Sequence, residues 1–197
     1  MFVTFEGLDG SGKTTQAELL VESWRREGHD VVATREPGGT PLGERVRSIL
    51  LDGDEMAPWA EAALFAAARA ELVDRVIAPA LGAGRDVVSD RYVDSSLAYQ
   101  GIARKLGVDD VLDLNLRATR GLLPDRTILV LVDPEEALRR TPAADRIERE
   151  SLEFHRAVDS AYRQLAEMFP DRIVTFDGSL PADEIAEHIR GRLREHS

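Results

Sequence analysis

Five short apolar runs, separated by segments of helical periodicity, constrain the fold of this chain more than any other feature. The runs are FVTF (2–5), DVVAT (30–34), DVVSD (86–90), TILVLV (127–132) and RIVTF (172–176). They are rich in valine and isoleucine, which is typical of buried strands in a parallel sheet. Between them, apolar residues recur three and four positions apart, which indicates helices. The expected helices lie at roughly 13–27, 41–51, 58–82, 94–118, 134–140, 150–169 and 181–194.

Strands that alternate with helices predict an α/β fold, in which helices flank a five-stranded parallel sheet on both faces and make three layers. Such sheets bind ligands beyond the carboxyl ends of their strands, so the residues just after each run are candidates for chemistry. The segment 58–82 is apolar on more than one face. It is therefore either a central core helix of a monomer or a helix that also forms a subunit interface.

Composition narrows the class of protein. A chain of 197 residues fits a single domain, 1–197, with a full core. The net charge of −11 argues against a protein that coats nucleic acid, because such proteins carry basic patches. The chain has no cysteine, which excludes disulfides and thiolate metal sites. We find neither a signal peptide nor an apolar run long enough to span a bilayer, and we expect a cytoplasmic protein without membrane contact.

A glycine-rich turn with a lysine follows the first apolar run. Residues 7–14, GLDGSGKT, match the pattern G-x-x-x-x-G-K-[ST], called the P-loop, between a predicted strand and a predicted helix. Its backbone N–H groups and the positive end of the helix can cradle phosphates. Lys13, one of only two lysines, would neutralise phosphate, and the hydroxyl of Thr14 would bind Mg²⁺. The residues expected to bind the nucleoside triphosphate are Gly7, Leu8, Asp9, Gly10, Ser11, Gly12, Lys13, Thr14 and Thr15.

Two carboxylates follow the predicted strands that neighbour the P-loop. Asp90 ends the third apolar run, and Asp133 follows the fourth. A proline and two glutamates come directly after Asp133, which favours a role as the cap of a helix. We therefore predict that Asp90 serves Mg²⁺ together with Thr14, directly or through water. The guanidinium of Arg91 can clamp two phosphate oxygens, although a surface ion pair between Asp90 and Arg91 is the alternative.

Three further stretches could form a pocket for a second substrate. Phe65 and Arg69 lie four residues apart on the predicted helix and share a face, where a ring and a guanidinium could hold a base and its phosphate or carbonyl. The stretch TREPGGTPLGE (34–44) follows the second apolar run, and YVDSSLAYQG (92–101) supplies hydroxyls and an amide. Each stretch also has a purely structural interpretation. A phenylalanine is more often part of the core, an arginine is more often a solvated surface charge, and a glycine turn is often only a loop.

Together these stretches resemble the bacterial thymidylate kinases, a family of P-loop nucleoside monophosphate kinases. Across essentially the whole chain, the resemblance rests in order on FEGLDGSGKTTQ, TREPGGT, LFAAAR, SDRYVDSSLAYQG and DRIE. It implies a P-loop NTPase fold with a short lid at about 139–150. It also implies transfer of the γ-phosphoryl group of ATP to dTMP with Mg²⁺, which gives dTDP for dTTP and DNA synthesis. Finally, it implies a homodimer packed through helices that include 58–82.

The resemblance assigns roles to individual positions. Phe65 would stack on thymine, Arg69 would reach the base or the 5′-phosphate, and Arg91 would bridge the acceptor and donor phosphates. Asp9 would contact the sugar 3′-hydroxyl or the metal shell, and the ring of Tyr99 would disfavour a ribose. The full set implied for dTMP is Arg35, Glu36, Pro37, Phe65, Arg69, Arg91, Ser95, Ser96, Tyr99, Gln100, Asp145 and Glu148.

The lid departs from the family pattern. Some relatives carry an arginine in the P-loop where this chain has Gly10, so the arginine that stabilises the transferring phosphoryl group would come from the lid. The lid sequence RRTPAADRIER (139–149) has a short and uncharged middle. For each of its arginines, the alternative to a catalytic role is a place on a solvated helix face. The residues predicted to be catalytic are Asp9, Lys13, Arg91, Arg140, Arg146 and Arg149.

Two other functions share parts of this pattern. A kinase of another nucleotide or of a nucleoside would have the same fold, and a nucleoside kinase needs a general base such as Glu36. The motif match favours a thymidylate kinase over it. A GTPase switch would carry the tetrapeptide N-K-x-D, which is absent, and the only lysine beyond the P-loop is Lys105 in ARKLG.

Overall fold

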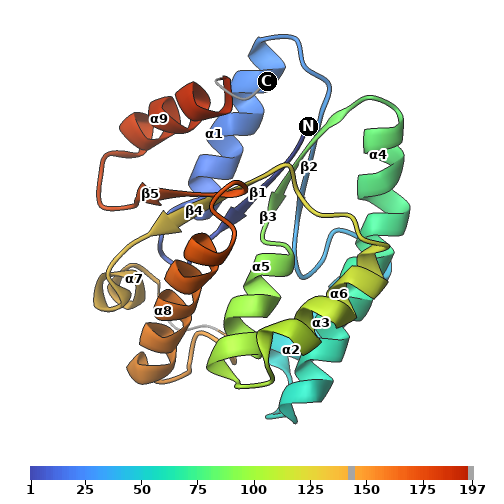
Figure 1. The fold of residues 1–197 in the computed structure, drawn as a ribbon, viewed down its shortest axis with the longest axis vertical. Helices are drawn as coiled ribbons and strands as arrows, with labels where there is room; N and C mark the ends of the chain where they lie inside the picture. Colours follow the sequence, from blue (N-terminus) through green and yellow to red (C-terminus); the bar gives the residue numbers. More distant parts are fainter. Residues whose placement is uncertain (142–144, 195–197) are drawn as a thin grey trace.

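A five-stranded parallel sheet forms the centre of the computed structural model, which describes residues 1–141 and 145–194 (Figure 1). The strand order is β2-β3-β1-β4-β5, and every neighbouring pair runs parallel. The strands are β1 Phe2–Glu6, β2 Val31–Arg35, β3 Asp86–Asp90, β4 Arg126–Leu131 and β5 Ile173–Asp177. The α/β fold and the strands predicted from the five apolar runs are confirmed, with each end within one residue of its prediction.

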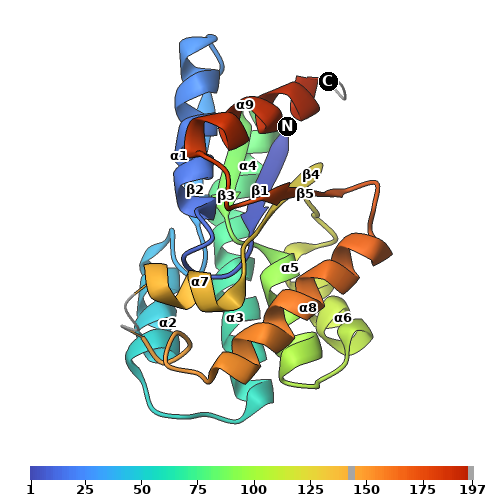
Figure 2. The ribbon, with the colours of Figure 1, turned by 90° about the vertical axis from the view of Figure 1, so that its left-hand side faces the viewer.

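Helices cover both faces of this sheet and make the three predicted layers (Figure 2). One face packs against α1 (Lys13–Arg26) and α9 (Ala182–Arg194) through an apolar cluster that includes Phe5, Leu20 and Ile189. The helices of the opposite face are α2 Pro41–Asp52, α3 Pro58–Leu72, α4 Ala78–Gly82, α5 Val93–Ser96, α6 Val108–Thr119, α7 Pro134–Arg140 and α8 Leu152–Met168. Because both faces are covered, all five residues of β1 are buried.

Two of the predicted helices differ from the observed ones. The segment 58–82 is helical throughout, but a π-helical stretch, η1 (Val73–Ile77), separates α3 from α4. The prediction of one helix over 94–118 is wrong, because the chain turns between the π-helical stretch η2 (Leu97–Ala103) and α6. Gly107 has φ 96° at this turn, a backbone conformation that favours glycine. The apolar periodicity continues across the turn because both helices pack against the same core.

The direction of the strands gathers the functional candidates at one edge of the sheet. β1 leads into the P-loop, β2 into the loop that begins at Glu36, β3 into Arg91 and β4 into Asp133. All these strands are parallel, so their carboxyl ends lie together. Within residues 1–141 and 145–194, no helix combines the length and apolar character needed to cross a bilayer.

Candidate functional site

The P-loop leaves the amino end of α1 open. The N-cap of α1 is Gly12, and no side chain caps this end, so its backbone N–H groups face a space that an anion can fill. Lys13 is buried, and its Nζ lies 2.8 Å from Asp9 Oδ1, which keeps the ammonium over the loop. A Cβ at Gly10 would lie 2.3 Å from the carbonyl oxygen of Ala137 in α7, so α7 covers the loop from above.

Asp9 joins two of the predicted catalytic cations. Its Oδ1 accepts from Lys13 Nζ at 2.8 Å and from Arg91 Nη2 at 2.8 Å. Burial alone would raise the pKa of Asp9, but the charges of Arg91 and Lys13 and their hydrogen bonds hold this pKa well below its usual range. The carboxylate of Asp9 is therefore ionised. It holds the side chains of Lys13 and Arg91 close together, because both donate to the same oxygen.

Thr14 and Asp90 form a small oxygen site beside the P-loop. Thr14 Oγ1 donates to Asp90 Oδ2 at 2.5 Å. Asp90 Oδ1 is buried, and no described residue donates a hydrogen bond to it. A hydroxyl and a carboxylate with an unused oxygen suit Mg²⁺, so these residues fit the expected ion. The alternative carboxylate, Asp133, caps α7 by accepting from the backbone N–H groups of Glu135 and Glu136, which confirms the predicted cap.

A cavity of about 570 Å³, its open mouth included, adjoins the P-loop on the side of Arg91. Of the residues predicted for the second substrate, those that line the cavity are Glu36, Pro37, Phe65, Arg91, Ser95, Ser96, Tyr99, Gln100, Asp145 and Glu148. Arg47, Leu51 and Ile147 also line it, although the sequence interpretation missed them. Arg47 and Leu51 belong to α2, which follows the predicted binding loop, and Ile147 lies within the DRIE motif.

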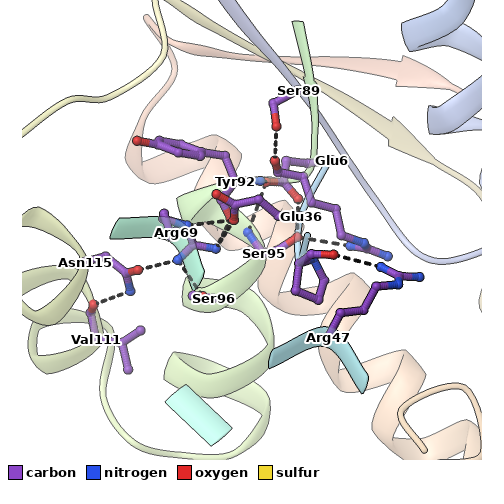
Figure 3. Close-up of polar contacts among 12 residues, drawn as sticks. Glu6, Glu36, Arg47, Arg69, Ser89, Tyr92, Ser95, Ser96, Val111 and Asn115 are labelled. Carbon is purple, nitrogen blue, oxygen red and sulfur yellow. Dashed lines mark hydrogen bonds and ion pairs between the residues drawn. The ribbon is translucent and has the colours of Figure 1, made fainter. Parts of the chain in front are cut away.

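Arg69 lies behind the wall of this cavity. Its side chain is 1% exposed, and Figure 3 shows it held by Glu36, Ser96 and Asn115. Its Nη2 lies 2.6 Å from Glu36 Oε2 and also donates to the carbonyl oxygen of Tyr92 at 2.9 Å. Burial raises the pKa of Glu36, and the charge of Arg69 opposes this shift. With these partners, Arg69 supports the cavity wall from behind.

Arg35 points away from the cavity. Successive side chains on an extended chain face opposite sides, so Glu36 turns inward while Arg35 turns outward. The guanidinium of Arg35 donates to both carboxylate oxygens of Glu44 at 3.1 Å. Both side chains are about half exposed.

The three lid arginines lie in different places. Arg140 Nη1 donates to the carbonyl oxygens of Gly10 at 3.5 Å and Gly178 at 3.1 Å, which puts Arg140 beside the P-loop. Arg146 points away from it and pairs with Glu61 at 2.7 Å. Arg149 borders a separate hollow together with Arg146. The middle of the lid, 142–144, lies outside the described residues.

Glu6, at the end of β1, is a site residue that the sequence interpretation missed. It is 0% exposed, and it accepts from the backbone N–H of Tyr92 at 2.8 Å and from Ser95 Oγ at 2.5 Å (Figure 3). Tyr162 Oη also donates to it, at 2.9 Å. Burial raises the pKa of Glu6 to about 7. Ser95 Oγ in turn accepts from Arg91 Nη1 at 3.0 Å, so Glu6 supports the residues that hold Arg91. A glutamate at the end of a fully buried apolar strand was the available signal.

Comparisons with known proteins identify the family of this chain. The family model described as thymidylate kinase matches residues 5–189. A thymidylate kinase of Synechococcus sp. (strain JA-3-3Ab) is 49% identical over 96% of this chain and 93% of its own length. One from Caldanaerobacter subterraneus subsp. tengcongensis is 48% identical over 90% of this chain and 86% of its own length.

A solved structure supports the fold as well. The crystal structure of thymidylate kinase from Ehrlichia chaffeensis superimposes with a TM-score of 0.83, is 32% identical, and covers 98% of both chains. The family match thus fits a chain that has both a P-loop and an adjoining cavity for a second substrate. The chain belongs to the thymidylate kinase family, and it phosphorylates dTMP to dTDP in an ATP-dependent reaction.

Proposed function

We propose that the P-loop binds the phosphates of ATP, that the adjoining cavity binds dTMP, and that Arg91 lies between the two reacting phosphates. One observation carries this assignment: Arg91 pairs with Asp9 of the P-loop at 2.8 Å and also lines the cavity. The same guanidinium can therefore contact a donor phosphate on one side and an acceptor phosphate on the other. Its guanidinium also lies 5.4 Å from the ring centroid of Tyr99, another lining residue, and this cation–π contact helps to hold it in place.

In the reaction, an oxygen of the dTMP phosphate attacks the γ-phosphorus of ATP, and the bond to the β,γ-bridging oxygen breaks as ADP leaves. The acceptor is already an anion, so the enzyme needs no strong general base. Repulsion between two polyanions is the main obstacle, and Lys13, Arg91 and the open N–H groups of α1 reduce it. Arg140 is the lid arginine that we assign to this cluster, because it contacts the P-loop at Gly10.

We assign Mg²⁺ to Thr14 and Asp90, directly or through water. The support is the buried Oδ1 of Asp90, to which no described residue donates, next to the hydroxyl of Thr14. When bound, Mg²⁺ would neutralise charge on the β- and γ-phosphates. Asp133 stays outside this assignment because the N–H groups of α7 already occupy its carboxylate.

For dTMP, we assign Phe65 to the base and Tyr99 to the sugar. Phe65 is a partly buried ring of α3 that lines the cavity together with residues of η2, and a flat apolar surface of this kind suits a stacked base. Asp145 and Glu148 line the same cavity from the carboxyl end of the lid. Arg69 is assigned to the wall, through Glu36 and Ser96, instead of direct contact with the base or the phosphate.

Phe65→Ala is expected to raise the KM for dTMP about tenfold or more and to leave the KM for ATP unchanged, because an aromatic ring stacked on a base contributes about 1–3 kcal/mol. The measurement is steady-state ADP formation with dTMP varied at saturating ATP. Phe169→Ala is the matched control, since Phe169 is also partly buried but packs against Arg172 away from the cavity. Equal KM values for dTMP in the two variants would contradict this assignment.

We propose that the enzyme is a homodimer joined through α2 and α3. Three of its most exposed large apolar side chains lie there: Leu42 at 43%, Ile49 at 51% and Trp59 at 48%. Leu42 and Ile49 are seven residues apart on α2 and so share one face. Exposed Ala63 and Ala67 on α3 provide small side chains that allow close approach of a second copy.

Ile49→Glu is expected to convert the dimer into a monomer, because it would bury a charge at the centre of the proposed apolar interface. Light scattering should then give the 21.8 kDa of one chain instead of twice that mass. Met168→Glu on α8 is the matched control, since Met168 is equally exposed at 52% but lies away from α2 and α3. A monomeric unmodified protein would refute the proposal.

We also propose that residues 139–150 act as the lid. Arg140 at one end contacts the P-loop, while Asp145 and Glu148 at the other end line the acceptor cavity. This segment therefore borders both substrates. The single domain over 1–197 and the cytoplasmic location stay predictions.

A further inference from the structure

A buried carboxylate lies behind the acceptor cavity, on the same helix as Phe65. Glu61, in the first turn of α3, is 2% exposed. Its Oε1 accepts from Gln100 Nε2 at 2.8 Å, and its Oε2 accepts from Arg146 Nη2 at 2.7 Å. Arg104 donates more weakly to both oxygens at 3.4 Å. Neither the P-loop nor the phosphoryl transfer described above uses Glu61.

Glu61 is ionised at neutral pH. Burial opposes its ionisation, but the hydrogen bonds from Gln100 and Arg146 and the charges of Arg104 and Arg146 hold its pKa below the usual value. These groups come from η2, from the turn after it and from the lid. A further carboxylate, Glu150, is paired with Arg104 at 2.6 Å. An ionised carboxylate has only acceptors, so every neighbour of Glu61 must turn a donor toward it.

This requirement fixes the side-chain amide of Gln100. An amide has a nitrogen that donates and an oxygen that accepts, and the two ends can exchange by a half-turn of the group. Beside an acceptor-only carboxylate, only the nitrogen can face Glu61. Gln100 also lines the acceptor cavity, and its nitrogen is occupied by Glu61. The oxygen is therefore the end of the amide that is available to a ligand.

We propose that Glu61 is a positioning residue that selects the acceptor base by holding the nitrogen of Gln100, so that the amide oxygen of Gln100 accepts an N–H from the base. The N3 position of thymine carries such an N–H, whereas N3 of cytosine carries a lone pair. A cytosine would therefore bring two acceptors together with no proton between them. The inference rests on the proposed binding of the base beside Phe65.

The size of the discrimination follows from the cost of unpaired polar groups. A site built to hydrogen-bond one group rejects an analogue that leaves its own buried atom unpaired, and one such mismatch corresponds to about 10- to 100-fold in kcat/KM. Uracil carries the same N3–H as thymine. The orientation of Gln100 therefore separates dTMP from dCMP and leaves dUMP to other contacts.

The test is the ratio of kcat/KM for dTMP to kcat/KM for dCMP in Glu61→Gln. A glutamine at this position can donate as well as accept, so the amide of Gln100 is free to reverse and present its nitrogen to the cavity. We expect the ratio to fall about tenfold or more, through a higher KM for dTMP and a lower KM for dCMP, with the KM for ATP unchanged. An unchanged ratio in the folded variant would overturn the inference.

Arg104→Met is the matched control for lost ion pairing. It removes a charged partner of Glu61 but keeps the hydrogen bond between Glu61 and Gln100, so the ratio should stay at the value of the unmodified enzyme. A ratio that falls equally in Arg104→Met and Glu61→Gln would mean that general loosening of the helices, instead of amide orientation, sets the preference.

Gln100→Met separates this inference from the site assignment and serves if Glu61→Gln does not fold. It removes both ends of the amide and leaves the ion pairs of Glu61 intact. We expect the KM for dTMP to rise and the ratio to fall as in Glu61→Gln. An unchanged KM for dTMP would show that the base binds elsewhere. A higher KM with an unchanged ratio would retain the site and refute the orientation effect.

Discussion

Replacing Arg91 with methionine is expected to lower kcat about a thousandfold or more, because an arginine that neutralises the transferring phosphoryl group contributes on this scale. The side chain of Arg91 is 14% exposed and is held by Asp9, Ser95 and Tyr162, so bulk water screens its charge only weakly. The measurement is ADP formation at saturating ATP and dTMP, with the KM values determined separately. Arg91 is the residue shared by both proposed substrate sites, so kcat should change more than either KM.

Two comparisons make this expectation specific. Arg91→Lys keeps a positive charge but loses the planar group that can contact two phosphates, so its kcat should lie between those of the unmodified enzyme and Arg91→Met. Arg149→Met should retain kcat within about threefold, because Arg149 borders a hollow away from the P-loop and exposed charges contribute little. A loss of less than tenfold in Arg91→Met, or an equal loss in Arg149→Met, would remove Arg91 from the transfer step.

The largest effect on stability is expected at Arg69. Arg69→Met should lower the free energy of unfolding by about 3–5 kcal/mol, because it leaves the carboxylate of Glu36 buried and uncompensated. Ser96, Asn115 and the carbonyl oxygen of Tyr92 lose their donor at the same time. Urea unfolding of the ligand-free protein, followed at one protein concentration, measures this change.

The pH dependence adds a second readout. Burial already raises the pKa of Glu36, and loss of Arg69 should raise it further. A carboxyl with a raised pKa in the folded state destabilises the fold when ionised, and this penalty is lost as the pH falls below the folded pKa. The deficit of Arg69→Met should therefore shrink toward acidic pH, and Glu36→Gln in the same chain should recover part of it.

An exposed ion pair serves as the control. Arg120 and Asp74 lie 2.8 Å apart with side chains 81% and 46% exposed, so Arg120→Met should cost less than about 1 kcal/mol. A loss below 1 kcal/mol in Arg69→Met as well would mean that the buried network contributes no more than a surface pair.

The strands were predictable because their signal is local. Each lies within a short valine- and isoleucine-rich run, and burial on both faces leaves little room for polar residues. The missed turn before α6 shows the limit of periodicity, which continues when two helices pack on one core. Lys105 and Gly107, two residues apart, formed a stop signal that the apolar pattern outweighed.

The site was predictable only where neighbours in sequence are neighbours in space. The P-loop is contiguous, so its spacing alone indicates a phosphate cradle. The direction of Arg146 depends on Glu61, 85 residues earlier in the chain, and the burial of Arg69 depends on Asn115, 46 residues later. For Glu6 the only signal was a glutamate at the end of an apolar run, and such a run does not show which side chains of distant helices will surround its last residue.

The packing of α7 on the P-loop also has an evolutionary consequence. At Gly10 the backbone has φ 81°, and an added Cβ would meet Ala137 O at 2.3 Å and Thr141 Oγ1 at 2.7 Å. In this chain a single substitution by any residue with a Cβ would collide with α7. A lineage could acquire a larger residue there only after α7 had shifted. The two segments, about 130 residues apart, are therefore bound to change together, and the order of their mutations is constrained.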